Sequence, residues 1–512
     1  MKNNQEEQLG IFNHELEPSY IYRDEDITPP SLGKDNAIKI MTRKSHLQLK
    51  NKIKNTQYYA FTTPDFNRQL DVDSDRYTGL VSIDIKKQKN IRKALLLWSE
   101  VANIKFVEIP KNEIRKGDIT IAGYTLALPP LAFRNNENKE YASADKVYED
   151  DSSADSGFIY LGESDIWLNA AGNILTDLSP QSDAQTTVLH EMGHVLGLSH
   201  SFYDDYELEG NSKLPKNHYD NTLQYSLMSY TSEESSTASF LTDEENEENN
   251  EKIEANDHDN FNIRCPSGPQ LYDIAAIQYL YGANYETRTG DDTYGFNGNT
   301  GHSFLTLENE KQQIVHCIWD AGGNDTLDFS GYSADQIIDL RQGHFSSTGG
   351  LYYNVSIAFN TFIENAIGGS GDDILIGNQK NNILVGHAGN DLLYGNGGAD
   401  HLWGGEGNDT FIYNHVDDSL TTSADTIHDF EIDKDKIDLS EILPPNRDVA
   451  LLNKFNASGQ TEIIQKYDEI HHITHLMISF DRDIYEYDMM IKLTGKHQLS
   501  LNNFILTPQL VA

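Results

Sequence analysis

The stretch HEMGHVLGLSH, residues 190–200, decides the fold of the first half of this chain. At 3.6 residues per helical turn, His190 and His194 lie on one face, while apolar residues cluster on the opposite face. Gly197 suits a helix end, because glycine takes the left-handed turn at little cost and lets the chain bring His200 back toward the other two histidines. Three imidazoles around one point predict a zinc site with an open fourth position.

The residues around this motif add a helix start and a catalytic base. Pro180 and Ser182, with Gln185 three residues after the serine, predict the helix N-terminus and a capping box. Zinc in such a site lowers the pKa of its bound water toward neutrality. Glu191, adjacent to His190, is placed to take the proton from that water and return it to a leaving amine. The motif therefore predicts hydrolysis of peptide bonds.

Helix and strand patterns flank the motif. Strands are predicted at residues 81–85, 105–109, 118–122 and 164–169. Apolar residues repeat at spacings of three and four between residues 91 and 102, with Trp98 as an anchor, and predict an amphipathic helix. A further helix at residues 271–281 is expected to close the domain. Together these elements predict an α+β module around the zinc helix.

Composition limits the classes of partner. The 512 residues suffice for two or more domains, and 39 basic against 80 acidic residues give a net charge of −41. This charge opposes binding to nucleic acid or anionic membranes and favours divalent cations, calcium above all. The sequence contains no apolar run of about 18 residues, so no membrane-spanning helix is predicted. Residues 1–10 lack the apolar core of a signal peptide. Cys265 and Cys317 are too few for a disulfide scaffold, and both one bridge and two free thiols are compatible with the sequence.

A nine-residue repeat occupies residues 368–412. Its units are GGSGDDILI, GNQKNNILV, GHAGNDLLY, GNGGADHLW and GGEGNDTFI, which follow the pattern G-G-x-G-x-D-x-U-x with U a large apolar residue. The first six residues of each unit predict a glycine-rich turn, and the last three predict a short strand with its apolar side chain pointing inward. The inward residues are Leu375, Leu384, Leu393, Leu402 and Phe411.

Two such units complete one turn of a parallel β-roll, so acids eighteen residues apart face each other across a calcium ion. The predicted pairs are Asp373 with Asp391 and Asp391 with Asp409. Asn382 takes the sixth position of the second unit. Its pairing with Asp400 therefore predicts a site of lower charge and lower affinity.

The zinc motif and the repeats together resemble the serralysins, secreted zinc metalloproteases with a metzincin catalytic domain and an RTX calcium-binding domain. The resemblance implies an α+β metzincin domain followed by an all-β parallel β-roll. It implies that His190, His194 and His200 bind zinc. It also makes Glu191 the catalytic base and makes Tyr230 the residue that ligates zinc at rest and then swings to stabilise the tetrahedral oxyanion.

The resemblance extends to structural residues and to calcium ligands. Met228 follows the third histidine where the family has its Met-turn, and residues 118–122 resemble the edge strand on which such enzymes lay an extended peptide. The implied calcium ligands lie before the repeats, at one glutamate and in the repeats themselves. They are Arg288, Gly290, Asp292, Gly322, Gly323, Asp325, Glu364, Gly369, Gly371, Asp373, Gly389, Asp391, Gly398, Asp400, Gly407 and Asp409.

The expected organisation has three parts. Residues 1–63 form a leader or propeptide region of a zymogen, residues 64–285 the metzincin domain with an acidic insertion at residues 232–267, and residues 286–512 the RTX domain with a C-terminal secretion region. The expected cofactors are one catalytic zinc and several structural calcium ions. The resemblance implies an extracellular monomer that cuts proteins and peptides and is exported by a type I (ABC) apparatus.

The competing hypothesis is a secreted RTX calcium-binding or adhesion protein whose zinc site is inactive or structural. The presence of Glu191 and Tyr230 argues against it, because a structural zinc needs neither residue. An RTX lipase lacks support, since no G-x-S-x-G stretch occurs in the chain.

Overall fold

A computed structural model describes residues 33–42, 54–61, 77–113, 119–126, 164–169, 179–201, 220–229, 231, 238–242, 244–246, 264–443, 448–455, 460–480 and 487–506. The chain divides into two compact units. The N-terminal unit takes its described residues from Arg23–Thr287 and Val315–Ala321. The C-terminal unit takes them from Arg288–Ile314 and Gly322–Ala512. No helix in these described ranges has the length and apolar content needed to cross a bilayer.

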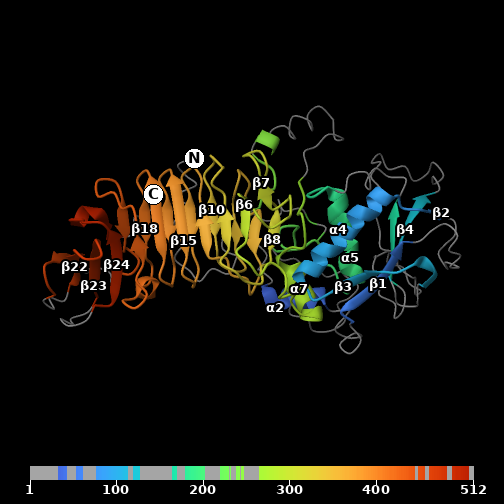
Figure 1. Cartoon of the computed structure of the whole chain (residues 1–512), viewed down its shortest axis with the longest axis horizontal. Coiled ribbons are helices and arrows are strands. Elements are labelled where there is room, and N and C mark those ends of the chain that lie inside the picture. Colours follow the sequence, from blue (N-terminus) through green and yellow to red (C-terminus); the bar gives the residue numbers. More distant parts are fainter. Residues whose placement is uncertain are drawn as a thin grey trace, which may run out of the picture. The chain divides into compact units, whose positions relative to one another are not determined.

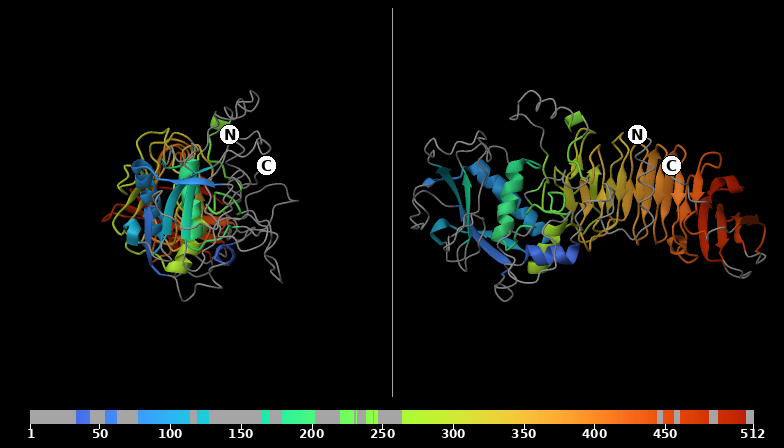
Figure 2. Two further views of the ribbon diagram at one scale, coloured as in Figure 1. Left: turned by 90° about the vertical axis from the view of Figure 1, so that its right-hand side faces the viewer. Right: turned by 180° about the vertical axis from the view of Figure 1, so that it is seen from behind.

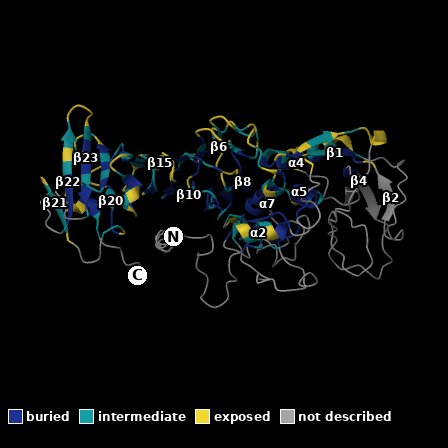
Figure 3. Ribbon diagram, turned by 90° about the horizontal axis from the view of Figure 1, so that it is seen from below, coloured by how far each residue is buried: buried dark blue, intermediate teal, exposed yellow. Residues whose placement is uncertain are grey.

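The N-terminal unit combines one sheet with helices. The sheet has the order β2-β4-β1-β3, with β5 paired to β4. Its strands are β1 (Thr56–Phe61), β2 (Tyr77–Val81), β3 (Lys105–Glu108), β4 (Ile119–Leu126) and β5 (Ser164–Asn169). The helices are α2 (Lys34–Met41), α4 (Ile85–Val101), α5 (Asp183–Val195) and α7 (Leu271–Tyr281). Figure 1 shows α4 and α5 next to each other beside the strands, and Figure 3 shows α5 and α7 as largely buried.

The sequence predicted most of these elements and missed two, α2 and β1. The strand at residues 164–169 and the helix at residues 271–281 are confirmed. The strand predicted at residues 81–85 is wrong, because β2 ends at Val81 and Asp84 already caps the next helix. The Asp84 carboxylate accepts a hydrogen bond from the Lys87 amide at 2.9 Å, so helix geometry begins one residue after it.

Strand β4 begins at Ile119 and so confirms the strand predicted at residues 118–122. The expectation that it is an edge strand is wrong. Ile119 and Thr120 pair with β1 on one side and with β5 on the other. Further along, Gly123 and Tyr124 lie between β2 and β5. Both hydrogen-bonding edges of β4 are therefore occupied by the sheet itself, and a peptide cannot pair with it. Periodicity predicted the strand, but no local signal gives its position in the sheet.

The C-terminal unit contains a roll of two sheets whose strands pair in parallel along the repeats, with antiparallel pairs at the C-terminal end of the larger sheet. One sheet contains β7 (Thr306–Leu307), β6 (Thr293–Phe296), β9 (Thr326–Asp328), β13 (Asn365–Ile367), β15 (Ile383–Ala388), β17 (His401–Glu406), β19 (Thr426–Ile427) and, beyond it, β24 (Met489–Thr494), β23 (Ile473–Ser479), β22 (Thr461–Asp468) and β21 (Val449–Leu452). The other contains β10 (Ile337–Asp339), β14 (Ile374–Ile376), β16 (Leu392–Tyr394), β18 (Thr410–Ile412), β20 (Lys436–Asp438) and β25 (Phe504–Ile505). Figure 2 shows these strands stacked side by side along the unit.

The register of the roll follows the repeat. Leu375 pairs with Leu393 and Leu384 pairs with Leu402, each eighteen residues apart. Successive units alternate between the two sheets, as a two-unit turn requires. All five predicted inward side chains are at most 1% exposed. The repeat therefore predicted the strands, their register and the core of this region.

Candidate metal centres

The zinc helix begins and ends where the sequence predicted. The Ser182 hydroxyl accepts a hydrogen bond from the Gln185 amide at 3.2 Å, which caps the start of α5. The Gln185 side chain does not return to the cap as a capping box requires. It donates instead to the Ser267 carbonyl at 3.2 Å. At the other end Gly197 has φ of 102°, the left-handed region that favours glycine, and the chain turns back there.

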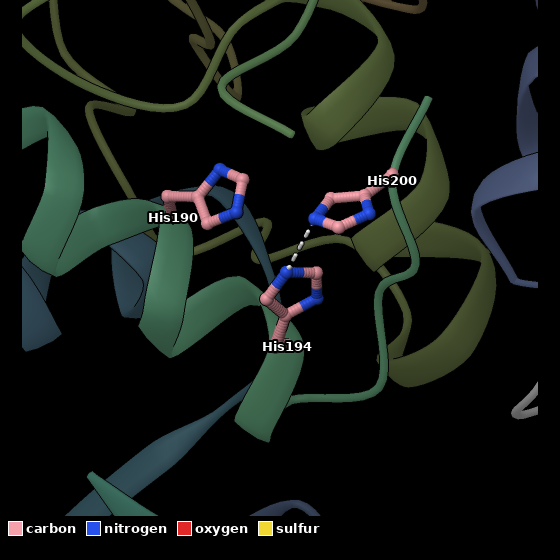
Figure 4. A group of neighbouring side chains, drawn as sticks. All are labelled: His190, His194 and His200. Atoms are coloured by element: carbon pink, nitrogen blue, oxygen red, sulfur yellow. Dashed lines mark hydrogen bonds between the residues drawn. The ribbon is translucent and has the colours of Figure 1, made fainter. Parts of the chain in front are cut away.

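This turn brings His190, His194 and His200 together. All three side chains are buried, and one ring nitrogen from each lies within 4.8 Å of the others. Figure 4 shows the three rings converging on one point, two from α5 and one from the segment after it. The Nε2 atoms of His194 and His200 are 3.1 Å apart. Spacing alone therefore predicted a real cluster of nitrogen donors.

Backbone carbonyls fix the orientation of two of these rings. His190 Nδ1 donates to the Leu227 carbonyl at 2.6 Å, and His194 Nδ1 donates to the Leu198 carbonyl at 2.9 Å. With the proton held on Nδ1, the lone pair of each neutral ring is on Nε2, the atom that faces the cluster. Burial lowers the pKa of His190 to about 4, against the opposing effect of its hydrogen bond to Leu227. Neutral imidazoles with oriented lone pairs fit a zinc ion.

Met228 packs against the zinc helix at Gly193, between His190 and His194. Its side chain is fully buried, and a Cβ atom built on Gly193 would lie only 2.7 Å from the Met228 sulfur. The same Cβ would lie 3.3 Å from Cζ2 of Trp98. Gly193, between the two helical histidines, thus lets the methionine and the tryptophan approach the helix backbone.

Sequence analysis missed Asp273, a fully buried carboxylate at the start of α7. It accepts hydrogen bonds from the Ser226 hydroxyl and the Leu227 amide, both at 2.7 Å, and from the Gln270 amide at 2.8 Å. Leu227 is also the residue whose carbonyl holds His190. Asp273 therefore positions the first histidine through one intervening residue. The available signal was an acid within the apolar helix LYDIAAIQYLY, which is costly unless the acid is hydrogen-bonded.

Helix α2 supports the third histidine. Its Ala37, Ile40 and Met41 are fully buried, and it packs against α7. The Met41 carbonyl accepts a hydrogen bond from the amide of Ser199, the neighbour of His200, at 2.7 Å. Both α2 and β1 fall within residues 1–63, and both are integral to the N-terminal unit.

Of the two residues expected to take part in chemistry, Glu191 is described and Tyr230 is not. Glu191 lies on α5 between the two helical histidines and is 4% exposed. Tyr230 lies outside the described residues. The acidic insertion at residues 232–267 is described only in part, at residues 238–242, 244–246 and 264–267.

The acids of the repeats form a ladder inside the C-terminal unit. The amide of Asp373 donates to the Asp391 carboxylate at 2.8 Å, and the amide of Asp391 donates to that of Asp409 at 2.9 Å. The amide of Asn382 donates to the Asp400 carboxylate at 2.7 Å. Each predicted pair is therefore adjacent in the structure.

The ladder continues beyond the repeats through two acids that the sequence analysis missed. The amide of Asp400 donates to the Asp425 carboxylate at 2.9 Å, and the amide of Asp409 donates to that of Asp435 at 3.1 Å. These acids follow their partners by 25 and 26 residues in place of 18. The intervening loops break the nine-residue period, but the strands that follow, β19 and β20, rejoin the sheets in register.

Four of the ladder acids have one carboxylate oxygen engaged by a backbone amide and the other without a hydrogen-bond donor among the described residues. In Asp373 and Asp435 backbone amides bind both oxygens. The second oxygens of Asp391, Asp400, Asp409 and Asp425 are buried and have no hydrogen-bond partner within the described part of the chain. Burial raises the pKa of Asp391 to about 8 and that of Asp400 to about 9. Buried oxygens without a donor suit a hard divalent cation such as calcium.

The segments before the repeats also converge. The amide of Asp292 donates to the Asp325 carboxylate at 2.8 Å, and the amide of Asp325 donates to the Glu364 carboxylate at 2.9 Å. A Cβ atom on Gly323 would lie 2.0 Å from the Gly290 carbonyl oxygen, so only glycine allows this approach. The ligand segments implied by resemblance thus lie together within the C-terminal unit.

Comparison with known proteins covers both units. Residues 72–238 match the family model for matrixin, and residues 283–506 match the model for the peptidase M10 serralysin C terminal. The chain is 38% identical over 422 residues to serralysin of Proteus mirabilis, with 80% of each chain covered. It is 39% identical over 424 residues to serralysin C of Dickeya chrysanthemi, covering 82% of this chain and 80% of the relative.

Other relatives agree. Metallopeptidase AprA of Pseudomonas marginalis is 41% identical over 369 residues, covering 71% of this chain and 69% of the relative. Among solved structures, the AlgE6R2 subunit of the Azotobacter vinelandii mannuronan C5-epimerase aligns over 36% of this chain and 92% of its own, at 22% identity and a TM-score of 0.21, which is too low to support an argument. The matches to both family models and to full-length relatives are decisive. The chain belongs to the serralysin family and is a zinc metalloendopeptidase.

Proposed function

We propose that this protein is a secreted endopeptidase that cuts extracellular proteins at a zinc ion held by His190, His194 and His200. The observation that carries the proposal is the convergence of three buried ring nitrogens within 4.8 Å. Two of the rings have their lone pairs directed into the cluster by backbone carbonyls. When bound there, zinc supplies Lewis acidity that makes water nucleophilic and polarises a peptide carbonyl.

The chain's own residues supply the proton transfers. Glu191 accepts a proton from the attacking water as the new carbon–oxygen bond forms, and it passes that proton to the amide nitrogen as the carbon–nitrogen bond breaks. Its burial beside the histidines favours this role, because a low dielectric strengthens a carboxylate's interaction with a nearby proton donor. By family resemblance the Tyr230 hydroxyl donates a hydrogen bond to the oxyanion that develops on the substrate carbonyl.

We propose further that calcium stabilises the C-terminal unit. The supporting observation is the ladder of acids, each with one oxygen bound by a backbone amide and several with a second buried oxygen that lacks a donor. The ligand set extends the one implied by resemblance to include Asp425 and Asp435. Export by a type I apparatus and a monomeric state are part of the same proposal and rest on the family.

The proposed organisation keeps an N-terminal leader, a metzincin domain and an RTX domain. The packing of α2 and β1 bears on the first boundary, because both elements belong to the N-terminal unit. We therefore place residues 33–61 with the catalytic domain. A removable leader would then end before Gly33, so that α2 keeps its contact with Ser199.

The test is casein hydrolysis by the full-length protein together with its zinc content. Removal of metal with a zinc chelator in the presence of calcium should abolish cleavage, and stoichiometric zinc should restore it. His194→Ala should lose both zinc and activity. The matched control is His471→Ala, an exposed histidine of the C-terminal unit, which should keep both. A chelated protein that still cleaves casein would overturn the proposal.

A further inference from the structure

A pair of histidines lies on the outside of the roll, far along the chain from the zinc motif. His401 is the first residue of β17, and His428 directly follows β19. Leu402 and Ile427, their neighbours in sequence, point into the core and are at most 1% exposed. Because side chains alternate along a strand, His401, Trp403 and His428 point to the outer face.

The strand register brings these three side chains together. His401 pairs with Thr426 and Leu402 pairs with Ile427, so the next position sets Trp403 opposite His428. The amide of His428 donates to the Leu402 carbonyl at 2.9 Å, which continues the ladder by one step. The Trp403 and His428 rings are stacked, with centroids 3.9 Å apart and planes 5° from parallel. The tryptophan thus holds the His428 ring in one orientation.

The two imidazoles face each other through nitrogen atoms. His401 Nδ1 lies 2.7 Å from His428 Nε2. At this distance one nitrogen donates a hydrogen bond and the other accepts it, since two protonated nitrogens would repel. If a metal ion displaces the single shared proton, His401 Nδ1 and His428 Nε2 can each offer a lone pair to that ion. Two imidazole nitrogens from a rigid sheet are ligands that copper(II), nickel(II) and zinc accept and that calcium does not favour.

We propose that His401 and His428 form a second metal site of this protein, a surface site for a divalent transition-metal ion with water in its remaining positions. An ion about 2.0–2.1 Å from each nitrogen would hold the two nitrogens roughly 2.9–3.3 Å apart. The pair must open by only a few tenths of an ångström from its present 2.7 Å. His401 is exposed to solvent, and stacking on Trp403 keeps His428 in place.

The site differs from the metal centres described above. It contains no carboxylate, and it lies on the outer face of the sheet, whereas the ladder acids are buried. By affinity order among divalent ions, copper(II) should bind most tightly. Binding does not depend on the proposed protease activity, so failure of one proposal leaves the other standing.

The test is copper(II) titration of full-length protein that already holds calcium and one zinc, in a Glu191→Gln background to prevent self-digestion. Calorimetry should show one added equivalent, and electron paramagnetic resonance should show coupling to imidazole nitrogens. His401→Ala and His428→Ala should each lose this equivalent, while zinc content stays at one. His401→Gln, which keeps a polar side chain of similar size, should lose it as well.

The matched control is His475→Ala. His475 lies on the same outer face, on β23, which is three strands away from His401 in the sheet. This variant should keep the copper equivalent. Unchanged copper binding in both His401→Ala and His428→Ala, or absence of an added equivalent in the parent, would show that the two imidazoles are only hydrogen-bonded to each other.

Discussion

The zinc cluster and the acid ladder are opposite ways of building a metal site. In the zinc cluster the donors are neutral rings, and carbonyls of Leu227 and Leu198 already orient two of them. In the ladder the metal-binding groups are carboxylates, four of which have a second oxygen that is buried without a hydrogen-bond donor in the described part of the chain. The first arrangement is complete before a metal arrives, whereas the second carries uncompensated charge that only a cation or a proton removes. The two units should therefore respond differently to loss of metal.

Removal of calcium should have the largest effect. Each of the four ladder carboxylates with an oxygen lacking a donor costs several kcal/mol if it stays ionised in the core without a cation. The C-terminal unit should therefore lose its β-structure in a calcium chelator and regain it when calcium returns. Circular dichroism during a calcium titration measures this directly. A roll that keeps its strands and its thermal midpoint without calcium would remove the distinction between the two kinds of site.

The next largest effect should come from Asp273→Ala. The substitution leaves the buried Leu227 amide without its acceptor, which costs about 1–3 kcal/mol, and it loosens the carbonyl that orients His190. We expect weaker zinc binding, slower casein cleavage and a lower unfolding midpoint of the N-terminal unit, with calcium binding unchanged. Glu469→Ala, at an exposed acid of the C-terminal unit, is the control for loss of charge. Normal zinc affinity in Asp273→Ala would show that the Leu227 carbonyl needs no such support.

The same residue predicts a dependence on pH. Burial raises the pKa of Asp273 from 3.8 to about 6, so between these values the folded protein holds a proton that the unfolded chain has released. Its contribution to stability is therefore present below about pH 4 and is lost as the pH rises to about 6, by about 3 kcal/mol at most. Asp273→Asn should lack this part of the slope when unfolding is followed in saturating calcium. Identical slopes in the two proteins would contradict the assignment.

The smallest effect is expected at Asn382, which takes the place of the aspartate in the second nine-residue repeat. Asn382 Nδ2 donates to the Glu364 carbonyl at 2.9 Å, a bond that a carboxylate cannot make. Asn382→Asp should therefore lower stability without calcium by about 1 kcal/mol and should raise calcium affinity, because the cation then neutralises the new oxygen. Calcium titration followed by circular dichroism measures both quantities. Destabilisation at every calcium concentration would mean that the asparagine is only structural.

Local spacing predicted what local geometry determines. The histidines at 190, 194 and 200 and the nine-residue repeat fix side-chain direction through helical and strand periods, and both were correct in the structure. Contacts made by segments distant in the sequence have no such local pattern. Asp273, Met41 and Asp435 reach their sites through tertiary packing or through loops that break the period. The position of β4 inside its sheet was missed for the same reason, since pairing order is not a local property.

The central claim is that Glu191 moves the proton at a zinc site held by three histidines. The most direct measurement is casein hydrolysis by Glu191→Gln protein with its zinc content determined on the same sample, beside Glu113→Gln, an exposed glutamate of the same unit. The account predicts that Glu191→Gln retains one zinc and loses about 10²–10⁴-fold in rate, while Glu113→Gln matches the parent. Full activity in zinc-loaded Glu191→Gln would contradict it.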